Sequence, residues 1–409
     1  MKILFFSDNF PPETNAPASR GYEHACEWVK LGHQVTVLTC APNFPAGRLF
    51  AGYKNCWYQV EWMNGIKVIR VKTFITQNSG FALRILDYLS FMLSSAFFAF
   101  FQECPDIVLG TSPQFFTAVG AWFLSFARRL PFVFEVRDLW PASIVAVGAM
   151  QKSLMIRFFE KLELFLYRRA ALIITVTQAF KDDLVSRGIS PEKIQIVLNG
   201  INSELFSPRQ KDAELLKFYH LENRFVVAYI GTHGMAHQLE NILFAAQRLQ
   251  VSRPEIYFLF VGEGAEKSKL LQLAKDLQLA NVCFIPAQPK SEIARYWSLC
   301  DMALVHLKND PVFSQVIPSK IFEAVGMEIP ILLAAPRGES QKLVENYGLG
   351  AWVPAGQMEN FVASLEKFST SPQHLTAYRA TARTACKQFS RQAQASHMLG
   401  LLKKVAAEK

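Results

Sequence analysis

The chain has 409 residues, 51% of them hydrophobic, and carries a formal net charge of +9 with a pI near 9.1. This length exceeds one ordinary core and predicts two domains. The basic charge suits anionic ligands, but no arginine-rich run or known nucleic-acid motif occurs, so we expect no nucleic-acid partner. The seven cysteines are scattered without a C-x-x-C pair, which argues against a disulfide framework and a zinc site.

The sequence predicts a cytoplasmic protein without an export signal. Residues 1–8 form a short strand that ends in an acidic loop, and the apolar part is too short for a signal peptide. The longest uncharged apolar stretch, residues 88–102, is too short to span a bilayer unaided.

The first half of the chain alternates strands with helices. A polar loop over residues 8–20 and a helix over 21–31 separate the first two strands. Expected strands cover residues 2–7, 34–39, 66–71, 106–111, 132–136, 172–177 and 195–198. This order predicts a parallel sheet with right-handed crossovers.

Residues 207–222 are polar and predict a linker, after which the alternation restarts. Strands are expected at 224–230, 256–261, 282–285, 302–306 and 331–335, and helices at 238–250, 266–278, 291–299 and 391–405. We therefore expect an α/β protein with two doubly wound domains.

The segment from residue 316 to 335 organises the second half. Pro318 has a φ suited to a first helical turn, Ser319 can accept from free backbone amides, and Gly326 allows a left-handed helix exit. The uncharged run 331–335 suits a strand buried on both faces.

Lys320 would then lie at a helix N-terminus on the rim of a parallel sheet, which is a suitable place for a phosphorylated ligand. Glu323, one turn later, could accept hydrogen bonds from sugar hydroxyls. The alternative is an ordinary helix–loop–strand connection with a solvated lysine and glutamate.

Residues 318–333 resemble the donor-site segment of glycosyltransferase family 4, retaining enzymes that use nucleotide-sugars. Residues 11–12 with 32–38, 199–206 and 262–264 resemble further motifs of that family. Within the family, the chain is most similar to bacterial transferases that build surface polysaccharides, the fucosamine-transferase type among them.

The resemblance implies the GT-B fold, two Rossmann-like domains that face each other across a cleft. The first domain would comprise residues 1–206, with the C-terminal helix of residues 391–409 packed back on it. The second, donor-binding domain would comprise residues 207–390.

The same resemblance implies site residues in the donor segment. Lys320 and the amides near Ser319, after Pro318, would hold the diphosphate, and Glu323 the ribose. The family has a second glutamate where this chain has Gln315, which can orient a donor hydroxyl but carries no charge.

Arg137 stands where many members have histidine, at the carboxyl end of an expected strand. Arg137, with Asp138 beside it, would orient the donor sugar or the acceptor. The alternative is an Arg–Asp pair that stabilises the strand end.

The family often has arginine and lysine after the first strand of the second domain, whereas this chain has Gly231 followed by His233 and His237. Lys267 and Arg20 are candidates to supply the missing phosphate charge. The alternatives are structural histidines and, for Arg20, a surface cap. Gly262 and Gly264 equally suit a tight turn that binds nothing.

We expect retaining transfer from a nucleotide-sugar, UDP-linked and including N-acetylated amino sugars, to a lipid-linked glycan in surface polysaccharide (O-antigen or capsule) biosynthesis. No cofactor and no metal are expected. Two alternatives stay open: a nucleotide-sugar 2-epimerase of similar architecture, and a catalytically silent UDP-binding partner.

Residues 81–101 are rich in Phe and Leu, and residues 128–169 carry eight basic against four acidic side chains, interleaved with apolar ones. Such a pattern suits a helix on an anionic surface. It predicts a polyprenyl-diphosphate-linked acceptor and peripheral attachment to the inner face of the bacterial cytoplasmic membrane. The alternative is that these helices only cover the first sheet.

Overall fold

Two α/β units make up the chain in the computed structural model, which describes residues 1–44, 46–76, 81–141 and 154–408. Unit 1 comprises Met1–Leu198 and Arg391–Lys409, and unit 2 comprises Asn199–Ser390. The sequence analysis placed this boundary later, after residue 206.

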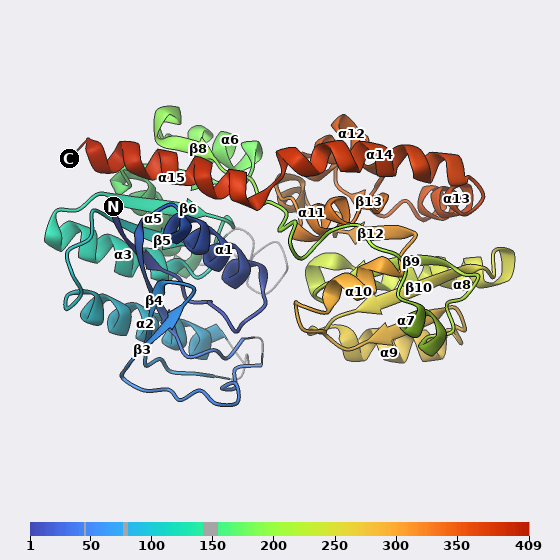
Figure 1. Ribbon diagram of the computed structural model, residues 1–409, viewed down its shortest axis with the longest axis horizontal. Coiled ribbons are helices and arrows are strands. Elements are labelled where there is room, and N and C mark those ends of the chain that lie inside the picture. Colours follow the sequence, from blue (N-terminus) through green and yellow to red (C-terminus); the bar gives the residue numbers. More distant parts are fainter. Residues whose placement is uncertain (45, 77–80, 142–153, 409) are drawn as a thin grey trace. The chain divides into compact units, whose positions relative to one another are not determined.

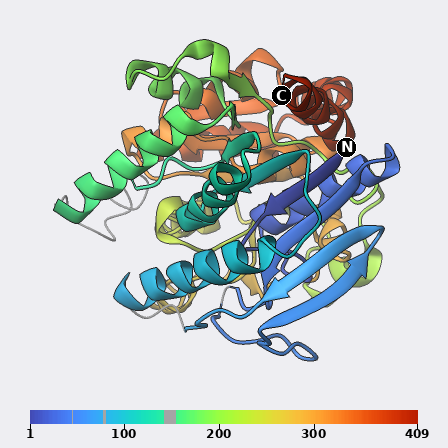
Figure 2. The same cartoon turned by 90° about the vertical axis from the view of Figure 1, so that its left-hand side faces the viewer.

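Unit 1 is built on an eight-stranded sheet of order β3-β4-β2-β1-β5-β6-β7-β8. All neighbouring strands are parallel except β3 and β4, which form an antiparallel hairpin. The strands are β1 (Lys2–Phe6), β2 (Gln34–Cys40), β3 (Tyr58–Met63), β4 (Ile66–Val71), β5 (Ile107–Thr111), β6 (Phe132–Val136), β7 (Leu172–Thr175) and β8 (Ile194–Ile196). Figure 2 shows the hairpin at the edge of this sheet.

Helices cover both faces of the first sheet, with α1 and α15 on one face and α2, α3 and α5 on the other (Figure 1). They are α1 (Ala16–Lys30), α2 (Phe81–Ala99), α3 (Phe115–Arg128), α5 (Leu154–Arg169), α6 (Gln178–Ser186) and α15 (Arg391–Ala407), with a 3-10 turn at Pro191–Lys193. The buried Trp28 indole on α1 donates to the Ala395 carbonyl on α15 at 2.9 Å. In the described stretches, none of the helices has the length and apolar character needed to cross a bilayer.

Unit 2 contains a six-stranded, fully parallel sheet of order β11-β10-β9-β12-β13-β14. The strands are β9 (Phe225–Ile230), β10 (Ile256–Val261), β11 (Val282–Ile285), β12 (Met302–His306), β13 (Ile331–Ala335) and β14 (Gly350–Pro354). Their apolar runs suit strands buried on both faces.

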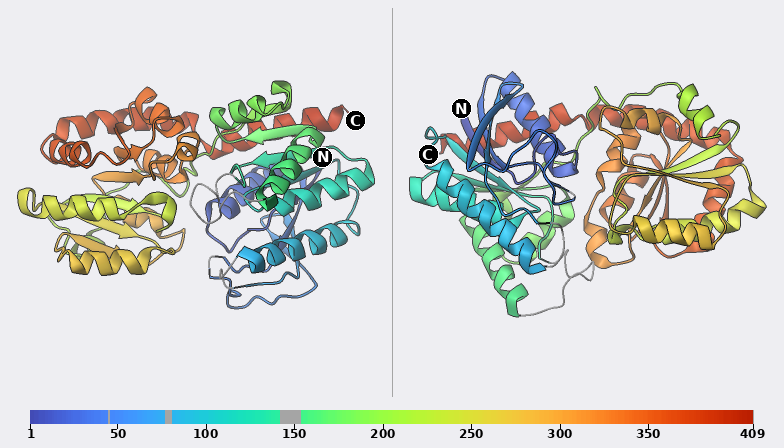
Figure 3. Two further views of the ribbon diagram at one scale, coloured as in Figure 1. Left: turned by 180° about the vertical axis from the view of Figure 1, so that it is seen from behind. Right: turned by 90° about the horizontal axis from the view of Figure 1, so that it is seen from below.

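The right-hand view of Figure 3 shows helices on both sides of this twisted sheet. They are α7 (Ala213–Phe218), α8 (Glu240–Ser252), α9 (Lys267–Asp276), α10 (Ile293–Ser298), α11 (Ser319–Gly326), α12 (Glu339–Asn346), α13 (Met358–Ser369) and α14 (Pro372–Gln388), with 3-10 turns at Met235–His237 and Pro311–Gln315. Helix α7 lies in the stretch that the sequence analysis expected to be a linker.

Helix α1 begins five residues earlier than expected, at Ala16 rather than residue 21. Asn15 is its N-cap, and the Asn15 side chain accepts from the amide of Ala18 at 2.8 Å. The predicted loop over residues 8–20 is therefore too long at its C-terminal end. As a consequence, Arg20 is a helical residue whose side chain points into unit 1.

Gly326 does not provide the left-handed exit that the sequence suggested. It lies inside α11, and the residue with positive φ is Glu328, at 55°. A Cβ on Gly326 would lie 2.7 Å from Cγ2 of Ile201 and 3.0 Å from Cβ of Phe206. Gly326 therefore allows the segment around Ile201 and Phe206 to pack on α11, which ties that segment to unit 2.

We expect Gly326→Ala to destabilise unit 2 by about 1–3 kcal/mol, because the added methyl group overpacks this contact. Gly400→Ala is the matched control, because Gly400 on α15 has no atom within 4 Å of the position of its Cβ. That change should stabilise the protein by about 0.5–1 kcal/mol through helix propensity alone. Urea unfolding measures both, and equal stabilisation by the two substitutions would contradict the packing role of Gly326.

Candidate active site

The carboxyl ends of β9, β10 and β12 meet at one edge of the unit 2 sheet, and the loops after these strands, together with α9 and α11, carry the predicted donor residues of unit 2. Gly231 and His233 follow β9, Gly262 and Gly264 follow β10, and His306 ends β12. Ligands of open α/β sheets bind at this edge.

The Lys320 ammonium group is the most unusual feature of this edge. The residue is 7% exposed, and its Nζ lies 3.5 Å from the centroid of the Tyr229 ring. Within the described part of the chain, Nζ has no hydrogen-bond partner. Burial lowers the pKa of Lys320 to about 7, although Glu323 opposes the shift. A buried, unpartnered cation is costly and fits a site that an anion completes.

Gly231 allows the lysine to reach this position. Its φ is 145°, and a Cβ there would lie 3.0 Å from the Lys320 Nζ. A Cβ on Gly262 would lie 2.0 Å from the Gly231 carbonyl oxygen, and one on Gly264 would lie 2.3 Å from the His233 carbonyl oxygen. These glycines therefore serve close packing between the loops that follow β9 and β10.

Three histidines near Lys320 are held in the neutral state. Burial lowers the pKa of His233 to about 4, of His237 to about 3 and of His306 to about 4, and Lys320 adds to each shift. His237 and His306 hold each other, since each Nδ1 donates to the other residue's carbonyl oxygen, at 3.2 and 2.7 Å. Neither ring nitrogen of His233 has a hydrogen-bond partner among the described residues. The histidines therefore add polarity without adding charge.

Lys267 lies beside the same loops but is already engaged. Its Nζ donates to Oε1 of Glu263 at 2.6 Å and to the Gly262 carbonyl at 2.9 Å. Lys267 therefore forms an ion pair, whereas Lys320 at the same edge has none among the described residues.

The start of α11 differs from the prediction. Pro318 occupies the N-cap position and Ser319 is the first helical residue, so the serine side chain does not cap the helix. Because proline has no side-chain acceptor, no side chain caps the first-turn amides. Their dipole adds positive potential beside Lys320.

Glu323 and Gln315 flank this helix start. The Trp297 indole donates to Oε2 of Glu323 at 3.2 Å, which orients the carboxylate. Gln315 ends the 3-10 turn at Pro311–Gln315, and Gly338 allows this turn to approach α12, since a Cβ on Gly338 would lie 2.0 Å from the Ser314 carbonyl oxygen.

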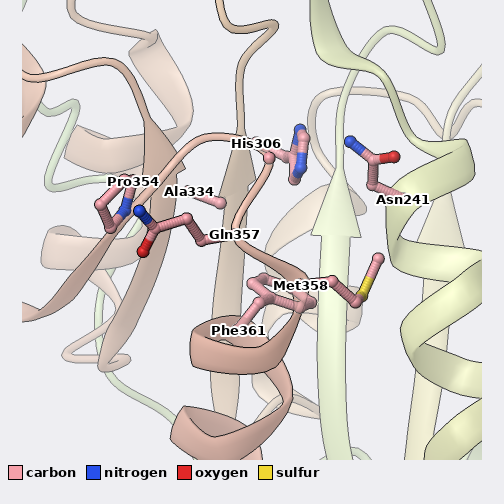
Figure 4. Close-up of a pocket in the computed structure, with 8 residues that line it drawn as sticks. Asn241, His306, Ala334, Pro354, Gln357, Met358 and Phe361 are labelled. Carbon is pink, nitrogen blue, oxygen red and sulfur yellow. The ribbon is translucent and has the colours of Figure 1, made fainter.

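A cavity of about 40 Å³ lies behind His306, at the carboxyl ends of β12, β13 and β14 (Figure 4). Its lining residues are Asn241, His306, Ala334, Pro354, Gly356, Gln357, Met358 and Phe361. This volume holds one or two water molecules and is too small for a nucleotide. A larger cavity, of about 350 Å³, lies at the amino ends of β1 and β2 in unit 1, at the edge opposite the predicted residues.

In unit 1, Arg137 and Asp138 follow β6 at the carboxyl edge of its sheet. Both backbone amides donate to Oγ of Ser112, at 2.7 and 3.2 Å. The Arg137 Nη2 donates to the Ala16 carbonyl at 3.1 Å. No ion pair joins Arg137 to Asp138, so the alternative of a stabilising Arg–Asp pair is wrong.

Arg20 corrects a prediction. Its side chain is 1% exposed, and it donates to Oε1 of Glu135 at 2.8 Å and to the carbonyls of Leu198 and Val197 at 2.7 and 3.0 Å. Because α1 turns this side chain inward, Arg20 stabilises unit 1 and does not reach a phosphate.

Two sequence profiles match the chain: one described as "Glycosyl transferase 4-like domain" matches residues 17–200, and one described as "Glycosyl transferases group 1" matches residues 211–385. The chain belongs to this family of glycosyltransferases. A putative colanic acid biosynthesis glycosyl transferase, WcaI of Escherichia coli K12, is 25% identical over 405 residues, which cover 93% of this chain and 95% of WcaI.

Solved structures show that this glycosyltransferase has the GT-B type of fold. Sucrose-phosphate synthase from Thermosynechococcus elongatus superimposes with a TM-score of 0.79 at 15% identity over the whole of both chains. Anabaena HepE, solved in complex with UDP-glucose, superimposes with a TM-score of 0.74 at 16% identity over 99% of this chain and 100% of HepE.

Sequence reasoning missed several residues of this glycosyltransferase. The sequence gives no sign that the Tyr229 ring contacts Lys320, because Tyr229 lies in an apolar strand. His306 and Glu135 do carry a signal, because a polar group in an otherwise apolar buried strand needs a partner. Glu135 finds that partner in Arg20.

Lys320→Met should stabilise the ligand-free protein below pH 7, because the folded state then no longer buries a charge. Above pH 7 the folded lysine loses its proton, while the unfolded lysine keeps it up to its ordinary pKa of 10.5. The wild type should therefore regain stability relative to Lys320→Met by about 1.4 kcal/mol per pH unit between pH 7 and about 10.

Chemical denaturation from pH 6 to 9.5 measures this difference. Lys269→Met is the control, since Lys269 has a side chain 76% exposed, and it should change stability by less than about 0.5 kcal/mol at every pH. A pH-independent difference between Lys320→Met and the wild type would contradict a buried, titrating ammonium group.

Proposed function

We propose that this glycosyltransferase moves a sugar from a UDP-sugar, with retention of configuration, to a lipid-linked glycan acceptor in bacterial surface polysaccharide biosynthesis. The observation that carries the proposal is the buried, unpartnered Lys320 ammonium at the carboxyl edge of unit 2. The name of WcaI and the UDP-glucose complex of HepE support the pathway and the donor class.

In this proposal, Lys320 neutralises the diphosphate, and the uncapped start of α11 provides amide donors beside it. Breaking the bond between sugar and diphosphate increases the negative charge on the leaving group. A preorganised cation in a site of low dielectric constant stabilises that charge more than it stabilises the ground state. The proposal therefore assigns this role to protein groups and requires no metal.

Glu323, oriented by Trp297, would accept hydrogen bonds from the ribose hydroxyls. Gln315 would contact the donor sugar. The acceptor hydroxyl would attack on the face that the diphosphate leaves, with its proton passing to the departing phosphate oxygen.

The test is a panel of nucleotide-sugars, scored first by binding and then by transfer to cell-envelope lipid extract. Lys320→Ala should weaken UDP and UDP-sugar binding alike and should also lower turnover, whereas Gln315→Ala should mainly lower turnover. The loss of a charged hydrogen-bond donor predicts about 1.5–3 kcal/mol for Lys320→Ala.

An equal loss of plain UDP affinity in both variants would overturn the division of roles. UDP binding without transfer would favour the silent partner, and an epimerised sugar-nucleotide formed without acceptor would favour the 2-epimerase.

The membrane part of the proposal rests on an aromatic face that runs across α2, α3 and α5. Phe100 contacts Phe123, and Trp122 contacts Phe165, with ring centroids 6.1 and 4.9 Å apart, so aromatic side chains connect the three helices. Strongly exposed apolar side chains on the same three helices are Leu93, Phe97, Phe126, Leu154 and Phe158, at 59–83% exposure. Basic residues lie on the same elements, namely Arg128, Arg129, Arg157, Lys161, Arg168 and Arg169. An apolar surface with basic flanks suits an anionic membrane that carries the acceptor.

The protein should float with anionic but not with neutral liposomes, and less so at high salt. Phe126→Glu combined with Phe158→Glu should weaken binding to anionic liposomes at least about tenfold, because each substitution removes the apolar contact area of one ring. Phe218→Glu in unit 2 is the matched control, because Phe218 is 72% exposed outside the aromatic face. No binding to either liposome would leave a soluble acceptor as the better interpretation.

A further inference from the structure

Arg137 is a second cation, half-buried, whose donors are mostly unused. Its Nη2 donates to the Ala16 carbonyl, but its Nε and Nη1 are shielded from water and have no hydrogen-bond partner in the described part of the chain. Burial lowers the pKa of Arg137 to about 9, so the guanidinium still carries its charge at neutral pH.

The carboxylates around Arg137 are already occupied. Glu135 is 2% exposed and uses one oxygen for Arg20 and the other for the Thr111 hydroxyl, at 2.8 and 2.7 Å. Glu23 forms an ion pair with Arg391. Arg137 therefore has no hydrogen bond to a carboxylate among the described residues, although the charge of Glu135 acts on it.

The remaining polar neighbour is neutral. Burial, together with the charges of Arg20, Arg391 and Arg137, lowers the pKa of His24 well below its usual value. Its Nε2 also has no hydrogen-bond partner among the described residues. The cluster thus consists of two ion pairs, one neutral imidazole and one guanidinium that has no hydrogen bond to a carboxylate among the described residues.

The position of this cluster points to a ligand. In the sheet, β2 lies on one side of β1, and β5 and β6 lie on the other, so the direction of the strand order changes at β1. Ligands of doubly wound sheets bind at the carboxyl edge beside such a switch point. Arg137 follows β6 at that edge, and its bond to Ala16 places it at the positive N-terminus of the 15-residue helix α1.

We propose that Arg137 is the centre of an oxyanion-binding site in unit 1, which takes a carboxylate or phosphate group of a substrate. A bound oxyanion would accept from Nε and Nη1, the two donors that the cluster leaves unused. His24 would supply a neutral polar wall to the same site.

This inference uses the proposed function only to name two sources of the oxyanion. The first is the carboxylate of an acidic sugar, and the second is the phosphate of a lipid-linked acceptor. Because the site is tested by binding alone, a failure to detect sugar transfer does not affect the result.

The experiment uses the full chain with Lys320→Ala, so that the phosphate site of unit 2 is removed. Inorganic pyrophosphate and D-glucuronate are the two probes, and D-glucose at the same ionic strength is the neutral comparison. Thermal stabilisation and titration calorimetry should detect binding of at least one anion and none of glucose. Tighter pyrophosphate binding assigns the site to an acceptor phosphate, and tighter glucuronate binding assigns it to an acidic sugar.

Adding Arg137→Gln should weaken that binding by about ten- to a hundred-fold, the effect of losing a charged hydrogen-bond donor. Arg379→Gln removes the same charge from an exposed helix residue of unit 2 and should leave anion binding unchanged. Should Arg137→Gln fail to fold, Arg137→Lys keeps the charge with fewer donors and should weaken binding to a smaller extent. Absent anion binding, or equal binding with and without Arg137, would overturn the proposal.

Discussion

The contact between the Lys320 ammonium and the Tyr229 ring determines how the carboxyl edge of unit 2 is built. A charge 3.5 Å from a ring centroid and away from water needs a close neighbour without a side chain, and Gly231 meets that need. The Gly231 carbonyl in turn approaches Gly262 so closely that a Cβ is excluded there. One buried cation therefore explains glycines that otherwise resemble an unspecific strand–helix turn.

The protein contains cations that are engaged by carboxylates and carbonyls and cations whose donors are unused among the described residues. Arg20 and Lys267 lie beside Glu135 and Glu263, and both are engaged by these carboxylates and by backbone carbonyls. Lys320 is buried and Arg137 is half-buried, and both have unused donors within the described residues. Leaving such donors unmet costs stability, and an anion bound as proposed above would offset that cost.

The alternation of apolar and turn segments predicted two α/β domains and twelve of the fourteen strands found among the described residues, because a parallel strand buried on both faces has a clear signal. β3 and β14 were missed. The first is an edge strand with Tyr58 and Trp62 exposed. The second starts at Gly350 and ends at Pro354, two residues that are uncommon in strands, so its sequence does not indicate a strand.

At the candidate site, Lys320 and His233 were expected at the carboxyl edge of the second sheet, and the structure places both there. The inward direction of the Arg20 side chain was not expected, because it depends on the residue at which α1 begins. The prediction of a left-handed helix exit at Gly326 was wrong for a similar reason, because the contacts of Gly326 with Ile201 and Phe206 join residues remote in sequence.

Three neutral histidines lie near Lys320 at the carboxyl edge of the unit 2 sheet. His233, His237 and His306 surround Lys320, and protonating any of them would place a second positive charge beside a buried one. Burial is the main cause of their low pKa values, as it is for Lys320, and the charge of Lys320 lowers each of them further. An anion at this edge changes the balance, since its charge favours the protonated lysine and adds an acceptor for its donors. If an anion binds at this edge as proposed, its binding would therefore be coupled to protonation of Lys320, and the ammonium would lose its proton most readily without the anion.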